Sequence, residues 1–317
     1  MKTQNSKQNG QQPIQSAGAL SAAILLFFFA LACSFNVGGE GKSAANSDKK
    51  TAATAKAKFE DSRPNALKDD KATKREANKQ SEAADNGDFE AVYVEVKNEK
   101  YADVNERFRQ QKIVEQIAES FNNDLSLPHD VAIKFKDCGQ ENAFYSPSEK
   151  SITMCYEFME SFYNAFVEMG KSEDEASDMM VGATMFFLLH ELGHCLIDVY
   201  NLPATGREED SVDQLSTYIL LNENDEDMHN AAIAGAAVFR AWSMNEEASP
   251  RAYADEHSLG SQRFYNITCW MYGRDQEQYA FLVEDGILPE ARAVRCPTEY
   301  KKMSSAWERL VEPYVKK

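Results

Sequence analysis

The segment Ser172–Tyr200 reads SEDEASDMMVGATMFFLLHELGHCLIDVY, and it determines both the fold and the chemistry that we predict for this chain. Its pattern predicts one long helix. Val181–Leu189 is almost entirely apolar, which indicates that the helix is buried in a core. The motif His190-Glu191-Leu192-Gly193-His194 follows directly. Two imidazoles without partners would be costly in such a place, so we expect the histidines to share a ligand.

The spacing of His190 and His194 indicates a metal site. Residues four apart lie on one helix face, so both imidazoles can bind one ion while Glu191 faces a water on it. Zn²⁺ suits imidazole ligands and lowers the pKa of its bound water to about 7. Glu191 would then be the general base that passes the proton of this water to a leaving amine. The alternative is a pair of solvated histidines on an ordinary helix, which the apolar segment before them disfavours.

A third metal ligand is expected from the next helix, which begins near residue 208. Glu209 and Asp213 are four apart there, which is the Glu-x-x-x-Asp arrangement of zincins whose third ligand is a glutamate. Glu209 would bind the metal, and Asp213 would accept the free ring N–H of one of the two histidines. Glu208 and Asp210 stay open as alternative ligands. Glu208, Glu209 and Asp210 could instead simply stabilise the helix N-terminus.

The segment from His190 to Leu221 resembles the core of a bacterial family of metallopeptidases of unknown substrate. The resemblance covers most of residues 89–300 and implies a zincin fold, but no demonstrated reaction. Cys195 departs from it, because a small apolar residue is more usual at this position. The other matching motifs are Leu127-Pro128, Asn142-Ala143-Phe144-Tyr145, Cys155-Tyr156-Glu157, Asp255-Glu256-His257-Ser258, Gln262-Arg263-Phe264-Tyr265-Asn266 and Tyr272-Gly273.

The same resemblance adds two expectations about the site. Zincins often align the substrate as an added strand on a sheet edge, which Asn142–Tyr145 or Ser151–Cys155 would supply here. A histidine followed at a distance by Gln-Arg is similar to segments near the metal in membrane-associated zincins, which makes His257 and Arg263 candidates. His257 would donate a hydrogen bond to the oxyanion of a tetrahedral intermediate.

Asp255-Glu256-His257 is expected to begin a helix. The alternative to a catalytic His257 is therefore a helix-capping cluster, with Arg263 paired to an acid of the fold. The two remaining histidines, His129 and His229, are expected at the surface.

The rest of the folded part predicts a small sheet followed by many helices, so the fold class is α+β, with an N-terminal sheet packed on a mainly helical zincin-like domain. Residues 89–96 alternate between apolar and polar, as in a half-buried strand. Further strands are expected at 131–135, 143–145 and 151–156, and one helix at Asn105–Leu125. The other helices are expected near 157–169, 173–199, 208–223, 226–243, 258–272, 275–284 and 298–315.

The N-terminal part predicts export. Residues 1–32 resemble a secretory signal, with two lysines and then sixteen uncharged residues from Ala17 to Ala32. Cys33 follows small residues, as in a bacterial lipobox, and would be the lipidated first residue of the mature protein. An ordinary signal peptide or an uncleaved anchor are the alternatives. Ser34 favours the outer membrane, facing the periplasm, over secretion or an inner-membrane anchor.

Composition divides the chain into a signal peptide (1–32), a disordered tether (33–88) and a folded domain (89–317). The tether has almost no large apolar residues, so it cannot bury enough surface to fold. The whole chain carries a net charge of −17, and all of this excess lies in the folded domain, which has 21 basic and 41 acidic residues. Such acidity argues against nucleic acid as a partner and would attract cationic peptides.

The cysteines of the folded domain predict two disulfides, because an exported protein folds under oxidising conditions. Cys138 and Cys155 flank a hairpin, and Cys269 and Cys296 flank a pair of helices, so we favour these pairings. Cys195 would stay free and buried. The alternative is a set of separate buried thiols.

These features predict a zinc metallopeptidase that hydrolyses peptide bonds and is anchored in the bacterial cell envelope. Two other functions stay open. One is a binding or assembly module that keeps the metallopeptidase fold with little or no turnover. The other is a zinc amidase that acts on non-peptide or cell-wall material.

Overall fold

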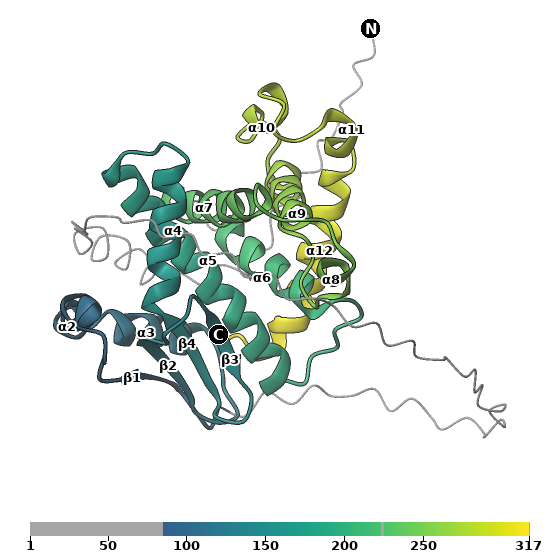
Figure 1. Ribbon diagram of the computed structural model, residues 1–317. Coiled ribbons are helices and arrows are strands. Elements are labelled where there is room, and N and C mark those ends of the chain that lie inside the picture. Colours follow the sequence, from purple (N-terminus) through teal and green to yellow (C-terminus); the bar gives the residue numbers. More distant parts are fainter. Residues whose placement is uncertain (1–84, 223–224, 317) are drawn as a thin grey trace, which may run out of the picture. The chain divides into compact units, whose positions relative to one another are not determined.

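The computed structural model describes residues 85–222 and 225–316. Three predicted features lie outside the described residues: the signal peptide (1–32), the lipidation site Cys33 and all but the last residues of the tether (33–88). The described chain is a mixed α+β structure, mostly helical with a four-stranded sheet near its N-terminal end (Figure 1). The predicted fold class, α+β with a small sheet first, is therefore confirmed.

The sheet has the strand order β1-β2-β4-β3. Strands β1, β2 and β4 run parallel to one another, and β3 pairs antiparallel with β4, so β3 forms one edge. Within the described residues no other strand pairs with the second side of β3. The strands are β1 (Phe89–Tyr93), β2 (Val131–Lys136), β3 (Ala143–Ser146) and β4 (Ser151–Cys155).

The helices that follow the sheet include one long central helix, α5 (Figure 1). Helix α5 packs against α4, α6 and α7, and also against strands β3 and β4. The helices are η1 (Glu99–Tyr101), α2 (Ala102–Gln110), α3 (Ile113–Asp124), α4 (Tyr156–Glu168), α5 (Glu173–Val199), α6 (Glu208–Asn222), α7 (Glu226–Ser243), α8 (Pro250–Ala254), α9 (Gly260–Arg274), α10 (Phe281–Glu284), α11 (Glu290–Ala293), α12 (Cys296–Val311) and η2 (Glu312–Tyr314).

Helix α5 is long and apolar enough to cross a membrane, but 89% of its most apolar window is buried inside the protein. It is therefore the core helix of the domain. Ser172 caps its N-terminus in a reciprocal arrangement with Glu175, which fixes where the helix starts. Its apolar residues from Met180 to Leu189 are buried among the neighbouring helices, so the motif that follows them emerges from the core at a defined place.

The prediction of one helix at Asn105–Leu125 is wrong, because the chain breaks into α2 and α3 at Lys112. This residue has a left-handed backbone with φ 53°. The break turns the second half so that Phe108 in α2 and Ile113 in α3 are both buried. The prediction of a helix at 275–284 is also too long, since only Phe281–Glu284 is helical.

The predicted helix start at Asp255 is wrong as well, because α9 begins at Gly260 and residues 255–259 form a loop. The side chain of Asp255 bonds to His257 within this loop instead of capping a helix, as the next section describes. The prediction for His229 is also wrong. It is 8% exposed, and its Nδ1 lies 2.6 Å from Nε2 of Gln278. His129 is half-buried.

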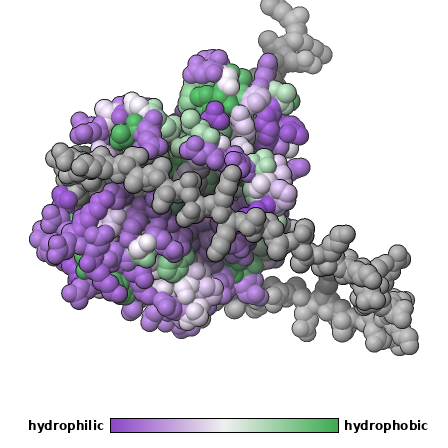
Figure 2. Space-filling model, in the orientation of Figure 1, coloured by the Kyte–Doolittle hydropathy of each residue, from purple (hydrophilic) through white to green (hydrophobic). Residues whose placement is uncertain are grey.

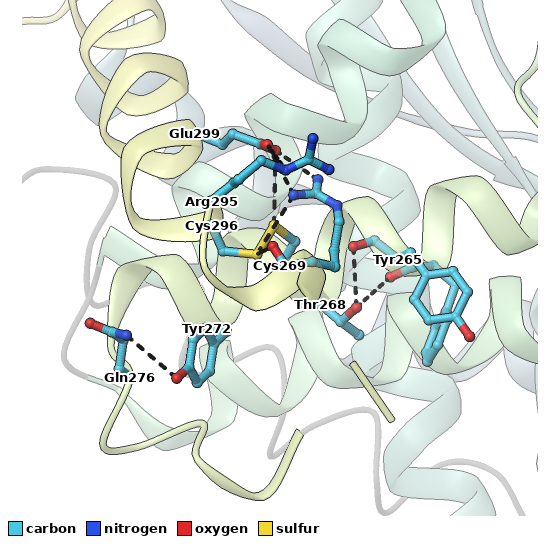
Figure 3. Close-up of a disulfide and its surroundings, with 10 residues drawn as sticks. Tyr265, Thr268, Cys269, Tyr272, Gln276, Arg295, Cys296 and Glu299 are labelled. Carbon is cyan, nitrogen blue, oxygen red and sulfur yellow. Dashed lines mark hydrogen bonds and ion pairs between the residues drawn. A yellow bond between two sulfur atoms is a disulfide. The ribbon is translucent and has the colours of Figure 1, made fainter. Parts of the chain in front are cut away.

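Two cysteine pairs lie at disulfide distance, and they are the predicted pairs. Cys138, near the start of the β2–β3 loop, joins Cys155 at the end of β4. Cys269 in α9 joins Cys296 at the start of α12, with Arg295 and Glu299 beside it (Figure 3). Cys195 is free and buried, as expected. The first link ties β4 to the loop that leads into the edge strand, and the second ties α9 to α12.

The surface reflects the acidic composition. Hydrophilic residues cover most of the visible face over the sheet and α2, while hydrophobic residues gather over α10 (Figure 2). Acidic residues open several helices, such as Glu173 and Asp174 in α5 and Glu226 and Asp227 in α7, where they also complement the helix dipole.

Candidate metal centre

Helix α5 carries both predicted histidine ligands to the edge of the core. His190 and His194 lie one turn apart, with their ring centroids separated by 5.0 Å. His190 is buried, and the side chain of His194 is mostly buried. The two rings therefore face the same small region, and both are largely shielded from solvent.

The third predicted ligand, Glu209, comes from the first turn of α6. Its carboxylate oxygens lie 3.1 Å from Nε2 of His190 and 3.2 Å from Nε2 of His194. Potential donor atoms of the three residues all lie within 4.8 Å of one another. Neither Glu208 nor Asp210 belongs to this group in the described part of the chain. The structure thus assembles the predicted set of two histidines with Glu209.

Gly193 allows α6 to approach α5 closely enough for this arrangement. A Cβ atom at position 193 would lie only 2.7 Å from Cγ1 and 2.8 Å from Cβ of Val212. Val212 follows Glu209 by one helical turn and precedes Asp213. The close contact at Gly193 therefore sets the distance of both acids from the histidines.

We expect the change Gly193→Ala to push α6 away from α5 and to loosen the whole ligand set. Overpacking of this kind costs about 1–3 kcal/mol of stability. Zinc affinity should fall by roughly 10- to 100-fold, as it does when a supporting residue is lost. Competition with a chromophoric chelator and denaturant unfolding measure the two effects. Gly206→Ala is the matched control, because a Cβ there meets nothing within 4 Å. Unchanged zinc affinity in Gly193→Ala would contradict this role.

Carboxylates hold the other ring nitrogen of each histidine. Nδ1 of His190 lies 3.0 Å from Oδ1 of Asp213, and Nδ1 of His194 lies 2.8 Å from Oε1 of Glu208. An Nδ1–H that donates to a carboxylate leaves Nε2 with a free lone pair. Both free lone pairs are then directed toward Glu209. Asp213 has the predicted supporting position, and His190 is its partner.

Asp213 is in turn held by Arg263 of α9. Nε of Arg263 donates to Oδ2 of Asp213 at 2.6 Å, and Nη2 donates to Oδ1 at 2.7 Å. Burial alone would raise the pKa of Asp213, but the guanidinium of Arg263 outweighs burial and lowers it. Arg263 also lies over the ring of Phe239, 4.1 Å from its centroid. Arg263 is thus paired with an acid of the fold. It orients the carboxylate of Asp213, which in turn holds His190.

The donor set fits a metal ion such as Zn²⁺, which prefers imidazole nitrogen and carboxylate oxygen in sites of this kind. Oε2 of Glu209 supports the fit. It is a buried oxygen with no hydrogen bond of acceptable geometry, although Nε2 atoms of His190 and His257 lie 3.1 and 3.2 Å away. A cation among these atoms would satisfy the oxygen that hydrogen bonds leave unsatisfied.

The same contacts shift the pKa values of the ligands in the metal-free protein. Burial would raise the pKa of Glu209, but its contacts with His190, His194 and His257 lower it well below the ordinary value. Burial would lower the pKa of His194, but Glu209 and Glu208 outweigh it and raise the pKa to about 9. The pKa of His190 is raised by Asp213 and Glu209 in the same way, against the effect of burial.

These raised pKa values predict how the stability of the metal-free protein depends on pH. A histidine whose pKa is higher in the folded state stabilises the fold below its unfolded pKa, and the contribution is lost as pH rises through the folded pKa. The chelator-treated protein should therefore have a lower Tm above pH 9 than near pH 6.5. Thermal unfolding at both pH values measures this, and His194→Gln should show a smaller difference. An equal or higher Tm above pH 9 would contradict the prediction.

Glu191, the predicted general base, is also buried. Burial raises the pKa of its carboxyl, and His190 and His194 lower it in part. A raised pKa makes the carboxylate a better proton acceptor near neutral pH. Its carboxylate also accepts a hydrogen bond from the backbone N–H of Tyr145. Glu191 therefore connects the histidine pair to the edge strand β3.

His257 lies beside the three ligands, on the loop between α8 and α9. Its Nε2 is 3.2 Å from Oε2 of Glu209, and its Nδ1 is 3.0 Å from Oδ1 of Asp255. Asp255 also accepts the backbone N–H of His257, which shapes the loop. Arg207 donates to the backbone oxygens of Asp255 and Glu256, which holds the loop against the start of α6. The structure thus brings the predicted His257 to the site, although not from a helix.

The roles of Glu208, Asp255 and Tyr145 at the site were not foreseen, although Glu208 was an alternative metal ligand and Tyr145 was part of an expected substrate-binding edge. The repeated pairing of a histidine Nδ1 with a carboxylate was the missed pattern, since Glu208 is adjacent to the ligand Glu209 and Asp255 is two residues from His257. The contact of Tyr145 with Glu191 is made by the backbone, so no side chain in the sequence could signal it.

Residues 93–311 match the model of a protein family whose description is "Putative metallopeptidase". The match covers more than half of the chain. The chain belongs to this family. The comparison with curated proteins gave no match, and neither did the comparison with solved structures. Family membership and the His190, His194 and Glu209 group point in the same direction, toward a metal-dependent hydrolase.

Proposed function

We propose that this chain is a zinc-dependent metallopeptidase of the zincin type. One observation carries the proposal: donor atoms of His190 and His194 on α5 and of Glu209 on α6 converge within 4.8 Å. The buried Glu191 follows His190 directly on α5. Zn²⁺, when bound there, would supply a Lewis acid and lower the pKa of a bound water. Membership of a metallopeptidase family supports the proposal.

Glu191 is the proton carrier in this mechanism. Its carboxylate accepts a proton from the attacking water, whose oxygen forms a bond to the carbonyl carbon of the substrate. The protonated Glu191 then gives this proton to the amide nitrogen as the C–N bond breaks. The Tyr145 N–H holds the carboxylate in place during both transfers.

His257 is the donor to the oxygen of the reacting carbonyl. Asp255 holds its Nδ1–H, but in the substrate complex Nε2 must carry a proton to donate, so the imidazolium form is the active one. Glu209 and, to a smaller extent, Asp255 favour this form, because their contacts raise the pKa of His257. The side chain is about half exposed, which leaves it accessible to a substrate.

We therefore expect His257→Ala to lower kcat by roughly 10²- to 10³-fold, the usual cost of one oxyanion donor. KM and zinc content should change little, because the substitution leaves the three ligands in place. Steady-state kinetics and metal analysis of the purified variant measure this. Loss of zinc in His257→Ala would make His257 a ligand instead, and an unchanged kcat would exclude it from the reaction.

Strand β3 is the place where we propose that the substrate backbone binds. Its residues alternate, so Phe144 and Ser146 direct their backbone groups to β4, while Ala143 and Tyr145 direct theirs to the free edge. The N–H of Tyr145 meets Glu191 there, so this edge faces the site. A peptide added to β3 would lie beside the general base.

We also propose the layout of the whole chain: a signal peptide at 1–32, a tether at 33–88 and the peptidase domain at 89–317. The uncharged run before Cys33 supports lipidation of this cysteine and placement in the cell envelope, at the periplasmic face of the outer membrane. Labelling with a radioactive fatty acid tests the anchor, since wild type should be labelled and Cys33→Ser should not.

The peptidase function is tested by zinc content together with cleavage of a mixed peptide library. The purified protein should hold one zinc ion per chain and release new peptide termini. A chelator should stop the cleavage, and added zinc should restore it. A zinc-loaded protein that cleaves no peptide would refute the proposed activity and would favour a binding module or an amidase with another substrate.

A further inference from the structure

One face of α5 continues from Glu191 to the end of the helix. Cys195 and Asp198 follow Glu191 by four and seven residues, so all three side chains share this face. Glu191 and Cys195 are buried, whereas the side chain of Asp198 is 34% exposed. Helix α5 packs against the edge strand β3, and this face carries the contacts described next.

Tyr145 of β3 is attached to this face at both of its ends. Its backbone N–H donates to the carboxylate of Glu191. Its hydroxyl donates to Oδ2 of Asp198 at 2.7 Å, and the thiol of Cys195 lies beside the same hydroxyl. Seven residues of helix span about 10 Å, because each residue adds about 1.5 Å. Tyr145 therefore bridges two turns of α5 and holds β3 along this length.

The contact between Tyr145 and Asp198 is a charge-assisted hydrogen bond. Burial raises the pKa of the Tyr145 hydroxyl, and Asp198 raises it further, so the hydroxyl keeps its proton. Burial would raise the pKa of Asp198, but Lys150 and Tyr145 outweigh burial and lower it. Nζ of Lys150, the residue directly before β4, lies 2.5 Å from the same Oδ2. An ionised acceptor makes such a bond roughly twice as strong as a neutral one.

Strand β3 has few other contacts that could set its tilt. It is four residues long, and within the described residues it pairs only with β4. Because these bonds lie on one side of the strand, they leave it free to tilt about that side. A tilt would move the Tyr145 N–H away from Glu191. The hydrogen bond to Asp198 is at the far end of the side chain, where it opposes this tilt most effectively.

We infer that Asp198 is a positioning residue of the proposed peptidase: it holds the Tyr145 hydroxyl and so keeps the Tyr145 N–H on the carboxylate of Glu191. The inference rests on the proposed function and adds to it a residue outside the metal group. Misplacing a catalytic group by about 1 Å can cost roughly 10²-fold in rate. The plain alternative is that Asp198 and Lys150 form an ordinary surface ion pair, which contributes little.

Steady-state kinetics of zinc-loaded variants are the first test. Asp198→Ala should lower kcat by roughly 10- to 100-fold, with little change in KM or zinc content, since a general base acts in the transition state. Asp198→Asn should keep most of kcat, because its amide oxygen still accepts the Tyr145 hydroxyl. Tyr145→Phe should match Asp198→Ala, and the double variant should be no slower than either. An unchanged kcat in Asp198→Ala, or losses that multiply in the double variant, would overturn the inference.

Two further variants test the plain alternative. Lys150→Met breaks the ion pair but leaves Asp198 to accept the Tyr145 hydroxyl, so kcat should fall by no more than about threefold. Glu149→Gln is the matched control, because it breaks the exposed ion pair between Lys134 and Glu149 in the same turn and should behave like wild type. A loss in Lys150→Met as large as that in Asp198→Ala would assign the effect to the ion pair and overturn the inference.

The second test needs no turnover. It follows hydrogen exchange of backbone amides by NMR in zinc-loaded protein that carries 15N-labelled tyrosine and phenylalanine. The signal of Tyr145 is identified by its absence from the tyrosine signals of Tyr145→Phe. In Asp198→Ala, the Tyr145 amide should exchange roughly tenfold faster than in wild type. The Phe144 amide should stay protected, because it bonds to β4, and this protection separates a local change from unfolding.

The exchange test separates the inference from the proposed function. Equal exchange at Tyr145 in wild type and Asp198→Ala would overturn the inference, even if the protein cleaves peptides. Faster exchange at Tyr145, with Phe144 still protected, would support the positioning of Glu191 by Asp198. If that protein cleaved no peptide, only the proposed function would fail.

Discussion

The variant Glu191→Gln is expected to keep its zinc and to lose peptide cleavage by roughly 10²- to 10⁴-fold, the usual contribution of a general base. Glutamine has almost the shape of glutamate and can stay beside the backbone N–H of Tyr145, but it cannot accept the proton of the attacking water. None of the three proposed ligands is altered. The structure of the metal site should therefore be preserved while its chemistry is removed.

Zinc analysis and cleavage of the mixed library, on wild type and Glu191→Gln prepared together, measure both halves of this prediction. Glu175→Gln is a suitable control, because this glutamate lies on the same helix but at its exposed N-terminus. Equal rates for wild type and Glu191→Gln, with zinc present in both, would show that the cleavage does not depend on Glu191. The proposed mechanism would then be wrong.

The variant His190→Ala is expected to lose zinc almost completely. Removing a supporting residue typically costs 10- to 100-fold in metal affinity, and removing a ligand should cost more than this. His190 is also the partner of Asp213, and that buried carboxylate would keep only Arg263. We therefore expect a lower Tm as well, and no cleavage above background.

Competition for zinc with a chromophoric chelator measures the loss of affinity. His129→Ala is the matched control, since it removes a histidine of the same domain that is not part of the metal group. The control should bind zinc like wild type. If His190→Ala bound zinc as tightly as His129→Ala, the site would have to lie elsewhere.

The core of the site could be predicted from the sequence because it depends on local spacing. His190 and His194 share a helix face whatever the rest of the fold is, and so do Glu209 and Asp213. The packing of α5 against α6, in contrast, depends on residues that are far apart in the sequence. The contact of Gly193 with Val212 sets the distance between α5 and α6, and the role of this glycine is recognised only once α6 is placed.

The errors in the predicted fold have a similar origin. The helical period runs through Asn105–Leu125 without interruption, but tertiary packing breaks the chain at Lys112 to bury both halves. The loop of Asp255 and His257 looked like a helix start because an acid near a helix N-terminus is common. In the structure the acid bonds to His257 and supports a site residue instead.

Composition shows only that the domain is acidic, whereas the structure assigns a role at the site to four of its acidic residues. Three of the acids near the site, Asp213, Glu208 and Asp255, each hold Nδ1 of one histidine. Glu209 faces all three Nε2 atoms. Four of the acidic residues thus arrange three imidazoles around one point, which is a local task separate from solubility.

The most direct test of the central claim is a crystal structure of the zinc-loaded protein with anomalous diffraction measured at the zinc absorption edge. The account predicts one anomalous peak per chain, at about 2.0–2.2 Å from Nε2 of His190, Nε2 of His194 and a carboxylate oxygen of Glu209. Glu191 should lie close to the peak without binding it. A peak at other residues, or no peak in protein that contains zinc, would contradict the account.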